Sequence, residues 1–216
     1  MRLDVGLAER PLHGEDRALI NLELGLFGVF DGLGGEGNGA EAAELATRTV
    51  EEYCQGKEPS IETLAHAVIE ANKAMIAARA DHLPMGYTTV TVCWVYGAQM
   101  HWVSVGDSRI YHQPSGRPLM PLSRDEGYRN ILSNCLGDDY EFKGLRQRVT
   151  SRMDPEDRIV LVTDGVTGDF KPDLLSPSDL EAAITGRGAQ AAAERLIEVL
   201  RKHDDRTAIV IDVLES

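Results

Sequence analysis

Acidic residues recur in this sequence at the points where apolar, strand-like segments begin or end. Asp31 directly follows one such segment, Asp164 closely follows another, and Asp204 precedes a third. The full set comprises Glu15, Asp16, Asp31, Asp107, Asp164, Asp204 and Asp205. Converging carboxylates repel one another unless cations lie between them, and oxygen ligands without His or Cys favour Mg²⁺ or Mn²⁺ over Zn²⁺. The pattern predicts a divalent-metal site if these ends meet; the alternative for each acid is a solvated loop residue.

The stretch from Phe27 to Asn38 is the most informative of these segments. Val29 and Phe30 are typical of the end of a buried strand, and Asp31 stands where that strand stops. The turn that follows contains five glycines, Gly32, Gly34, Gly35, Gly37 and Gly39. Glycine lets the backbone turn back tightly and point a carbonyl inward, which suits a hard cation. The alternative is an ordinary turn whose aspartate caps the following helix.

The elements that must position these acids alternate between strands and helices. Period-two and apolar runs predict strands at 3–7, 18–22, 24–30, 87–96, 100–105, 110–112, 157–162 and 208–213. Apolar stripes at helical spacing predict helices at 40–54, 60–80, 177–184 and 189–200. Residues 117–150 are hardest to interpret; we predict a short helix at 128–136 and a loop at 137–139. The order predicts one α+β domain over residues 1–216, with helices outside β-sheets.

Composition narrows the class of function. Acidic residues outnumber basic ones, 35 against 22, which gives a net charge of −13. This charge disfavours binding to nucleic acid or to anionic membranes, and no apolar stretch is long enough for a membrane helix. No basic region leads into an apolar run at the N-terminus, and three cysteines are too few and too scattered for a disulfide framework. We therefore expect a cytoplasmic protein with reduced, buried cysteines.

Five short motifs give the sequence a family resemblance. They are Asp31-Gly32-Leu33-Gly34-Gly35, Thr88-Thr89, Gly106-Asp107-Ser108-Arg109, Thr163-Asp164-Gly165 and Asp204-Asp205-Arg206-Thr207. In this order, over nearly the whole chain, they resemble the metal-dependent protein phosphatases, the PPM or type-2C family. The resemblance implies a four-layer αββα sandwich of two antiparallel β-sheets flanked by helix pairs.

The resemblance also implies a ligand set for two Mn²⁺ or Mg²⁺ ions. Asp31 would bridge both ions, the carbonyl of Gly32 would bind one, and Asp164 and Asp204 would bind the other. Asp107 resembles the ligand of a third metal in bacterial members. Asp16 and Glu15 would act through metal-bound waters.

The implied activity is that of a bacterial phosphoserine/phosphothreonine protein phosphatase. A hydroxide bridging the two metals would attack phosphorus in line, without a Cys or Ser nucleophile. The expected partner is a phosphorylated protein, with the enzyme opposing a Ser/Thr kinase. Cys93, in the middle of a predicted strand, is a packing residue on this interpretation.

Four features depart from the family pattern. Arg10 is the nearest candidate for the arginine that holds the substrate phosphate, but its spacing to Glu15 is one residue longer than expected, and a surface arginine is the alternative. Leu33 stands where many eukaryotic members have histidine, and Asp205 replaces the usual asparagine, so that it could compete with Asp204 as a ligand. The flap, residues 122–148, is shortened, which implies a more open site.

Three other functions remain open at this point. The first is a dedicated regulatory phosphatase for one partner, of the type that acts on anti-sigma-factor antagonists; the shortened flap and Asp204-Asp205 favour it. The second is a non-catalytic, phosphatase-like binding module. The third is an unrelated metal hydrolase acting on small phosphomonoesters.

Overall fold

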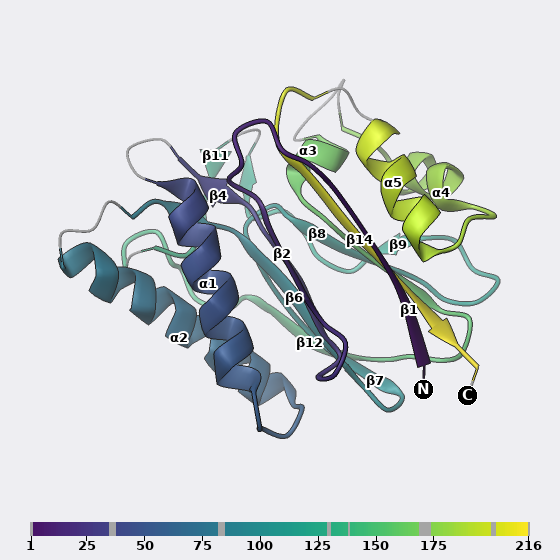
Figure 1. Cartoon of the computed structure of the whole chain (residues 1–216), viewed down its shortest axis with the longest axis horizontal. Coiled ribbons are helices and arrows are strands. Elements are labelled where there is room, and N and C mark those ends of the chain that lie inside the picture. The colour runs from purple at the N-terminus through teal and green to yellow at the C-terminus, as the bar shows by residue number, and fades with distance from the viewer. Residues whose placement is uncertain are drawn as a thin grey trace.

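Two antiparallel β-sheets lie face to face and carry helices on their outer faces (Figure 1). The structure is a computed structural model that describes residues 2–34, 38–81, 85–128, 131–137, 139–168, 174–199 and 202–215. The strand ends that carry the acidic motifs lie together at the top of this view, and both chain termini lie at the opposite end. The expected four-layer αββα sandwich is confirmed.

Each large sheet has five strands, all paired antiparallel. The first has the order β1 (Arg2–Arg10), β14 (Arg206–Leu214), β13 (Arg158–Val162), β8 (Arg109–Gln113) and β9 (Met120–Pro121). The second has the order β12 (Gln147–Arg152), β7 (Gln99–Val105), β6 (Val90–Tyr96), β3 (Leu26–Phe30) and β2 (Arg17–Asn21). Two short pairs complete the strands: β4 (Gly32–Leu33) with β5 (Tyr87–Thr88), and β10 (Gly127–Tyr128) with β11 (Ile131–Leu132).

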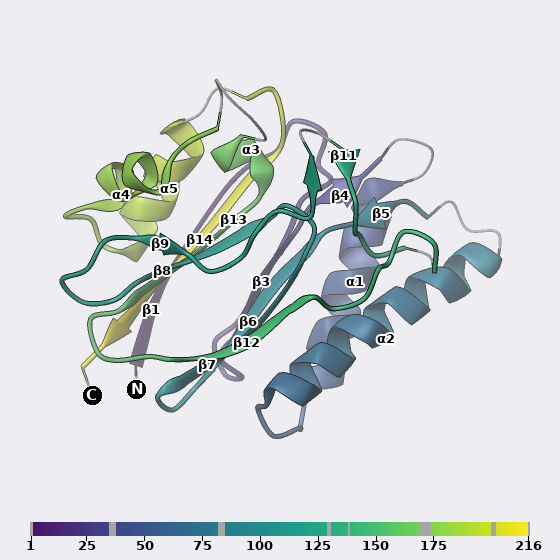
Figure 2. The same ribbon diagram turned by 180° about the vertical axis from the view of Figure 1, so that it is seen from behind.

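The helices cover the two outer faces in pairs (Figure 2). Helices α1 (Gly39–Cys54) and α2 (Ile61–Ala80) pack against each other and onto the second sheet. Helices α4 (Pro177–Ile184) and α5 (Ala189–Val199) lie on the first sheet, and the single-turn helix α3 (Asp164–Thr167) follows β13. The hydroxyls of Ser60 and Ser176 accept backbone N–H bonds and cap α2 and α4, as serine at these positions predicts.

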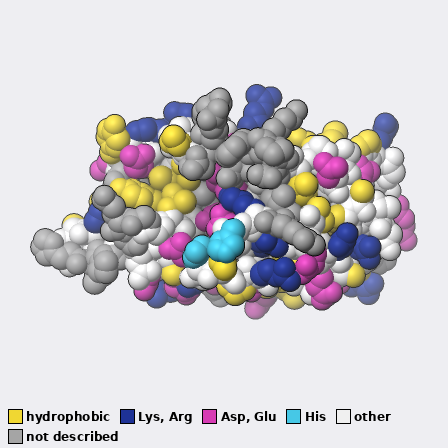
Figure 3. Space-filling model, turned by 90° about the horizontal axis from the view of Figure 1, so that it is seen from above, with side chains coloured by type: hydrophobic (Ala, Val, Ile, Leu, Met, Phe, Trp, Pro, Cys, Tyr) yellow, Lys and Arg dark blue, Asp and Glu magenta, His cyan; other side chains and the backbone are white. Residues whose placement is uncertain are grey.

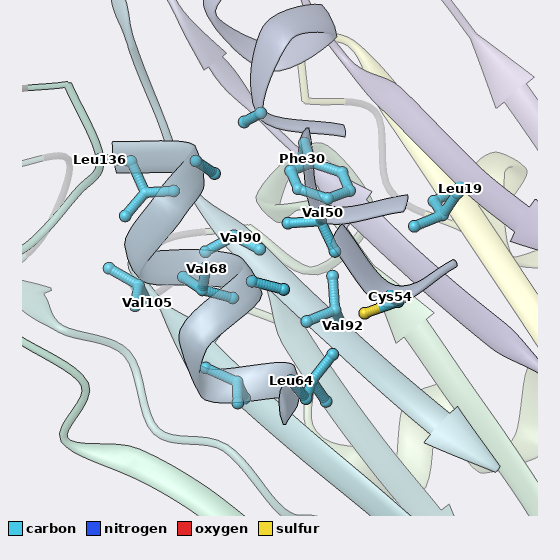
Figure 4. Packing of buried hydrophobic residues seen from close by; sticks show 14 of the residues in the cluster. Leu19, Phe30, Val50, Cys54, Leu64, Val68, Val90, Val92, Val105 and Leu136 are labelled. Carbon is cyan, nitrogen blue, oxygen red and sulfur yellow. The ribbon is translucent and has the colours of Figure 1, made fainter. Parts of the chain in front are cut away.

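Side-chain alternation along the strands divides the core into three layers. In β3, Leu26 and Phe30 face the helices α1 and α2, whereas Phe27 and Val29 face the other sheet. Figure 4 shows the helix-side layer, in which Phe30 packs near Val50 of α1. A buried layer on both faces makes β3 rigid, so the position of the residue that follows it, Asp31, is well defined.

The periodic segments follow the sequence prediction closely, but the flap does not. The predicted short helix at 128–136 is wrong: β10 pairs antiparallel with β11, and the described residues 131–136 contain no helix. Strand β12 was not predicted, because it is an edge strand with mostly polar, exposed residues. Asp138 of the predicted loop and Leu200 of the predicted last helix lie outside the described residues. Within the described part of the chain, every helix is too short or too polar to span a membrane.

Candidate metal centre

The predicted site residues come from loops at one end of the sandwich. This end receives the C-terminal ends of β1, β3, β7 and β13 and the start of β14. Figure 3 looks onto it and shows acidic side chains beside a group of histidines. His13 and His203 meet there, edge to face, with ring centroids 6.4 Å apart. Segments distant in sequence therefore bring their acids to one place, as the metal interpretation requires.

Asp31 is fixed through its backbone by the Thr88-Thr89 motif. Its N–H donates to the Thr89 hydroxyl at 3.1 Å, and its carbonyl accepts from the Thr89 N–H at 2.9 Å and from the Thr88 hydroxyl at 2.9 Å. The Thr89 hydroxyl also contacts the hydroxyl of Ser108 at 2.8 Å. Two of the sequence motifs thus hold the backbone of Asp31, leaving its carboxylate to interact with other groups.

The glycines of the following turn allow close contact with the loop that carries Glu15. A Cβ on Gly32 would overlap the backbone of Gly39, and a Cβ on Gly34 or Gly39 would collide with the Glu15 carboxylate. A side chain at Gly32 or Gly39 would force backbone apart, whereas one at Gly34 would displace the Glu15 carboxylate. Gly35 and Gly37 of the same motif lie outside the described residues.

Asp205 holds the loop between β1 and β2. Its carboxylate accepts hydrogen bonds from five consecutive backbone N–H groups, those of residues 12–16. Burial alone would raise the pKa of Asp205, but the donors of Leu12, His13, Glu15 and Gly14 outweigh it and lower the pKa to about 2. Both carboxylate oxygens of Asp205 are used in this way, so in this structure it acts as the anchor of the Glu15-Asp16 loop.

Asp16 lies between Thr163 and Thr207, which belong to two of the other motifs. Its Oδ2 accepts from the Thr163 hydroxyl at 2.8 Å and the Thr207 hydroxyl at 2.7 Å, while its buried Oδ1 has no hydrogen-bond partner. Burial is the main cause that raises the pKa of Asp16 to about 7; the two threonines oppose it, and the charges of Asp205 and Asp204 add to it. A buried carboxylate oxygen without a hydrogen-bond donor is stabilised by a proton, a water molecule or a cation.

Asp31 is the centre of the charge cluster. Burial raises the pKa of Asp31 well above its ordinary value, and the charges of four further aspartates raise it more: Asp16, Asp164, Asp107 and Asp204. One cation lies among them, since Lys202 Nζ is 2.5 Å from Asp164 Oδ2 and 3.0 Å from Asp204 Oδ2. The predicted site residues Asp16, Asp31, Asp107, Asp164 and Asp204 therefore act on one another electrostatically.

Asp107 is carried by a turn that is braced from two sides. Gly106 adopts a φ of 101°, a conformation that favours glycine, and its N–H donates to Glu126 Oε2 at 3.3 Å. Arg109 forms a two-pronged ion pair with Asp125 at 2.7 and 2.6 Å and also donates to the carbonyl of Gly168. The motif arginine thus ties the start of β8 to the flap and to the end of α3.

Arg10 lies at the end of β1 with a largely exposed side chain. Its guanidinium forms an ion pair with Glu198 of α5 at 2.5 Å. Arg17 also lies near Asp16, and it donates to the carbonyls of Gly14 and Asp16 and to Glu44. In the described structure both guanidiniums are engaged with groups of the protein, and the phosphate-binding role of Arg10 stays a prediction.

The donor set fits a hard divalent cation. It consists of carboxylate and carbonyl oxygens, burial raises the pKa of Asp16 and of Asp31, and Asp16 keeps a buried oxygen without a donor. Across the described ranges, however, no three His, Cys, Asp or Glu side chains already form a ready-made ligand set around one point. The side chains would therefore have to adjust on binding, and Lys202 is one of the groups that would move.

Three features of the site were not assigned a role from the sequence. These are the bonds of Thr163 and Thr207 to Asp16, the anchoring by Asp205, and the ammonium of Lys202. Thr163 and Thr207 stand next to or near an acid in their motifs, which was the available signal. Lys202 gave none, because a lone lysine before an acidic pair is common on protein surfaces.

Comparison with known proteins places this geometry in context. The family model described as Protein phosphatase 2C matches residues 15–202 of the chain. The serine/threonine phosphatase PstP/Ppp of Mycobacterium tuberculosis is similar in structure, with a TM-score of 0.85, 20% sequence identity and coverage of 100% of both chains. No curated protein sequence gives a significant match.

Two further solved structures are similar to the same extent. PppA, described as a key regulatory component of T6SS in Pseudomonas aeruginosa, has a TM-score of 0.82 at 21% identity and 98% coverage of both chains. The catalytic domain of PstP in complex with two manganese ions has a TM-score of 0.82 at 20% identity and 99% coverage of both chains. At these identities the similarity shows the fold.

Proposed function

Because this chain belongs to the protein phosphatase 2C family, we propose that it is a metal-dependent phosphoserine/phosphothreonine protein phosphatase. The observation that carries the proposal is the partly buried cluster of Asp16, Asp31, Asp164 and Asp204 at the strand ends. Bringing several partly buried carboxylates together is costly, so their presence favours a site that binds cations. PstP, one of the similar structures, contains two manganese ions, which supports Mn²⁺ or Mg²⁺ here.

The family resemblance implies how the residues would share the metals. Asp31 would bridge two cations, the Gly32 carbonyl would bind one of them, and Asp164 and Asp204 would bind the other. Asp107 would serve a third, and Asp16 and Glu15 would act through water. Two divalent cations supply an activated water and neutralise the charge on a transferring phosphoryl group.

The protein's own residues would orient this chemistry. Thr88 and Thr89 fix the backbone of Asp31, and Asp205 fixes the loop bearing Glu15 and Asp16. Asp16, with a pKa of about 7 before any metal is bound, would release its proton when a cation approaches. Positions held before binding lower the cost of reaching a reactive arrangement.

A covalent route through cysteine has no support in the site. Burial raises the pKa of the Cys93 thiol far above its ordinary value and that of Cys54 to about 12. The Cys93 side chain packs between the two sheets, where it was predicted to be a packing residue. Both thiols would therefore stay protonated and unreactive.

The test is hydrolysis of a phosphothreonine peptide with Mn²⁺, with Mg²⁺ and with chelator. We expect metal-dependent turnover that falls at least a hundredfold in Asp31→Asn, whereas Asp139→Asn, an exposed acid of the flap, stays at the wild-type rate. Bound metal without turnover would favour a phosphatase dedicated to one phosphoprotein; PppA, which has a similar fold, is described as a regulatory component. An absence of both binding and turnover would leave the non-catalytic binding module.

A further inference from the structure

Lys202 is placed where a metal of the proposed centre would compete with it. Its Nζ is 2.5 Å from Asp164 Oδ2 and 3.0 Å from Asp204 Oδ2, so one ammonium contacts both carboxylates that would bind the same metal. The Lys202 side chain is only 21% exposed, and that of Asp164 only 13%. Such a pair is screened weakly by solvent, so its charges act strongly on each other.

The position of this lysine is held from the backbone as well. The carbonyl of Lys202 accepts a bond from the guanidinium of Arg206, which also donates to the carbonyl of Ile197 at 3.0 Å. Arg206 of β14 thus connects the carbonyl of Lys202 to helix α5. The backbone of Lys202 is therefore held while its side chain contacts the acid pair.

We propose that Lys202 is a built-in cation that occupies the Asp164–Asp204 pair in the metal-free protein and competes with a divalent metal there. The inference rests on the proposed function, since it assigns these two acids to one metal. Without metal, the ammonium offsets carboxylate repulsion and keeps the pair together. With metal, a divalent ion and the ammonium would repel each other at the same oxygens, so binding requires that Lys202 swings away.

Two consequences follow from this competition. The lysine lowers the affinity of the second metal position, so the site fills only when the cation concentration is high enough to displace the ammonium. The displaced side chain carries three donors on a flexible four-carbon stem, so it would be free to contact an anionic group held by the metals. Lys202 would thus act as a positioning residue. Its ammonium would become available to the substrate only when a metal has displaced it from Asp164 and Asp204.

The test compares Lys202→Met with Lys202→Arg and with Lys73→Met as a matched control. Lys73 is an exposed lysine on α2 that pairs with Glu70, away from the site. Isothermal titration with Mn²⁺ gives the number and affinity of bound ions, and thermal melting is recorded with chelator and with excess Mn²⁺. These readouts do not depend on turnover.

We expect Lys202→Met to bind the Mn²⁺ ion of lower affinity, the one assigned to Asp164 and Asp204, about tenfold more tightly than the wild type does. The affinities of Lys202→Arg and Lys73→Met should remain near the wild-type value. We also expect the Met variant to melt lower than wild type with chelator and to gain more from Mn²⁺, because binding to the folded state raises stability in proportion to affinity. Equal affinities in wild type and Lys202→Met would overturn the inference but leave the metal centre intact. Failure of both proteins to bind Mn²⁺ would overturn the proposed centre together with the inference.

Discussion

Replacing Asp205 with asparagine should destabilise the protein without abolishing metal binding. The Asp205 carboxylate is only 4% exposed and accepts five backbone N–H bonds. Asparagine keeps one acceptor oxygen. If that oxygen retains the N–H groups of residues 12–14, the amide NH₂ faces the N–H groups of Glu15 and Asp16. The amide NH₂ and these two backbone N–H groups are all donors, so no hydrogen bond forms between them, and the negative charge of the carboxylate is also lost.

The expected size follows from the pKa of Asp205. One pKa unit corresponds to about 1.4 kcal/mol, so lowering the pKa from 3.8 to about 2 represents roughly 2.5 kcal/mol of preference for the ionised side chain. Water can reach part of the loop once the bonds break, and asparagine retains some of them. We therefore expect Asp205→Asn to lower the free energy of unfolding by about 1–2 kcal/mol at pH 7.

The assay is urea unfolding of wild type and Asp205→Asn from pH 7 down to pH 3, with Asp139→Asn as control. The folded-state pKa of Asp205 is depressed, so its contribution is present above about pH 4 and declines as the pH falls towards 2. The difference between the two proteins should therefore shrink below pH 4. A difference under about 0.5 kcal/mol at pH 7, or one unchanged down to pH 3, would refute the anchoring role. A loss of bound Mn²⁺ would instead indicate that Asp205 is a ligand.

Three other changes probe the same architecture. Gly165→Ala would drive a Cβ into the carbonyl of Asp205, so we expect little folded protein, as measured by circular dichroism and soluble yield, unlike Gly188→Ala, where space is open. Thr207→Val removes one of the donors to Asp16 while keeping the side-chain shape; we expect a loss of about 1 kcal/mol in urea unfolding, and an unchanged value would contradict the bond's role. With chelator, the raised pKa of Asp16 means that the folded state takes up a proton between about pH 4 and 7, so the melting temperature should rise as the pH falls from 8 to 6. Excess Mn²⁺ should remove that rise, and a rise of equal size with Mn²⁺ would argue that Asp16 is remote from the metal.

The regular elements were predictable because their patterns are local. Helix α1 was predicted from the apolar stripe of Ala42, Ala46 and Val50, and all three are fully buried. Strands β6 and β7 followed from a run of β-branched and aromatic residues interrupted at Gly97. In such segments the burial pattern and the intrinsic preference agree, so the fold adds little that the sequence does not already indicate.

The flap could not be predicted in the same way, because long-range contacts hold it. Strands β10 and β11 have two residues each, too few for any periodicity. The backbone of Glu126 donates to the carbonyl of Gly106, and its carboxylate accepts from Asn134 at 2.7 Å. These contacts connect the flap to the turn that carries Asp107, and the apolar pattern of residues 122–148 contains no signal of them.

The roles of the site side chains were likewise predictable only where they depend on local sequence. Asp16 and Asp31 could be named as candidates from their place at strand ends, whereas the function of Asp205 depends on a loop nearly 190 positions away in the chain. Asp204 and Asp205 are indistinguishable by residue type. Only the fold shows that one carboxylate faces Lys202 and the other faces the backbone of residues 12–16.

The groups that position these acids differ from the groups that neutralise their charge. Asp31 is fixed by threonine hydroxyls and backbone groups, Asp16 by two hydroxyls, and the loop that bears Glu15 and Asp16 by Asp205. None of the groups that support Asp16 and Asp31 directly changes charge near neutral pH, so the scaffold should persist with or without metal. What varies is the repulsion among the carboxylates, which protons, Lys202 or divalent cations can each relieve. The balance among these three, rather than the formation of the fold, should therefore set when the site becomes active.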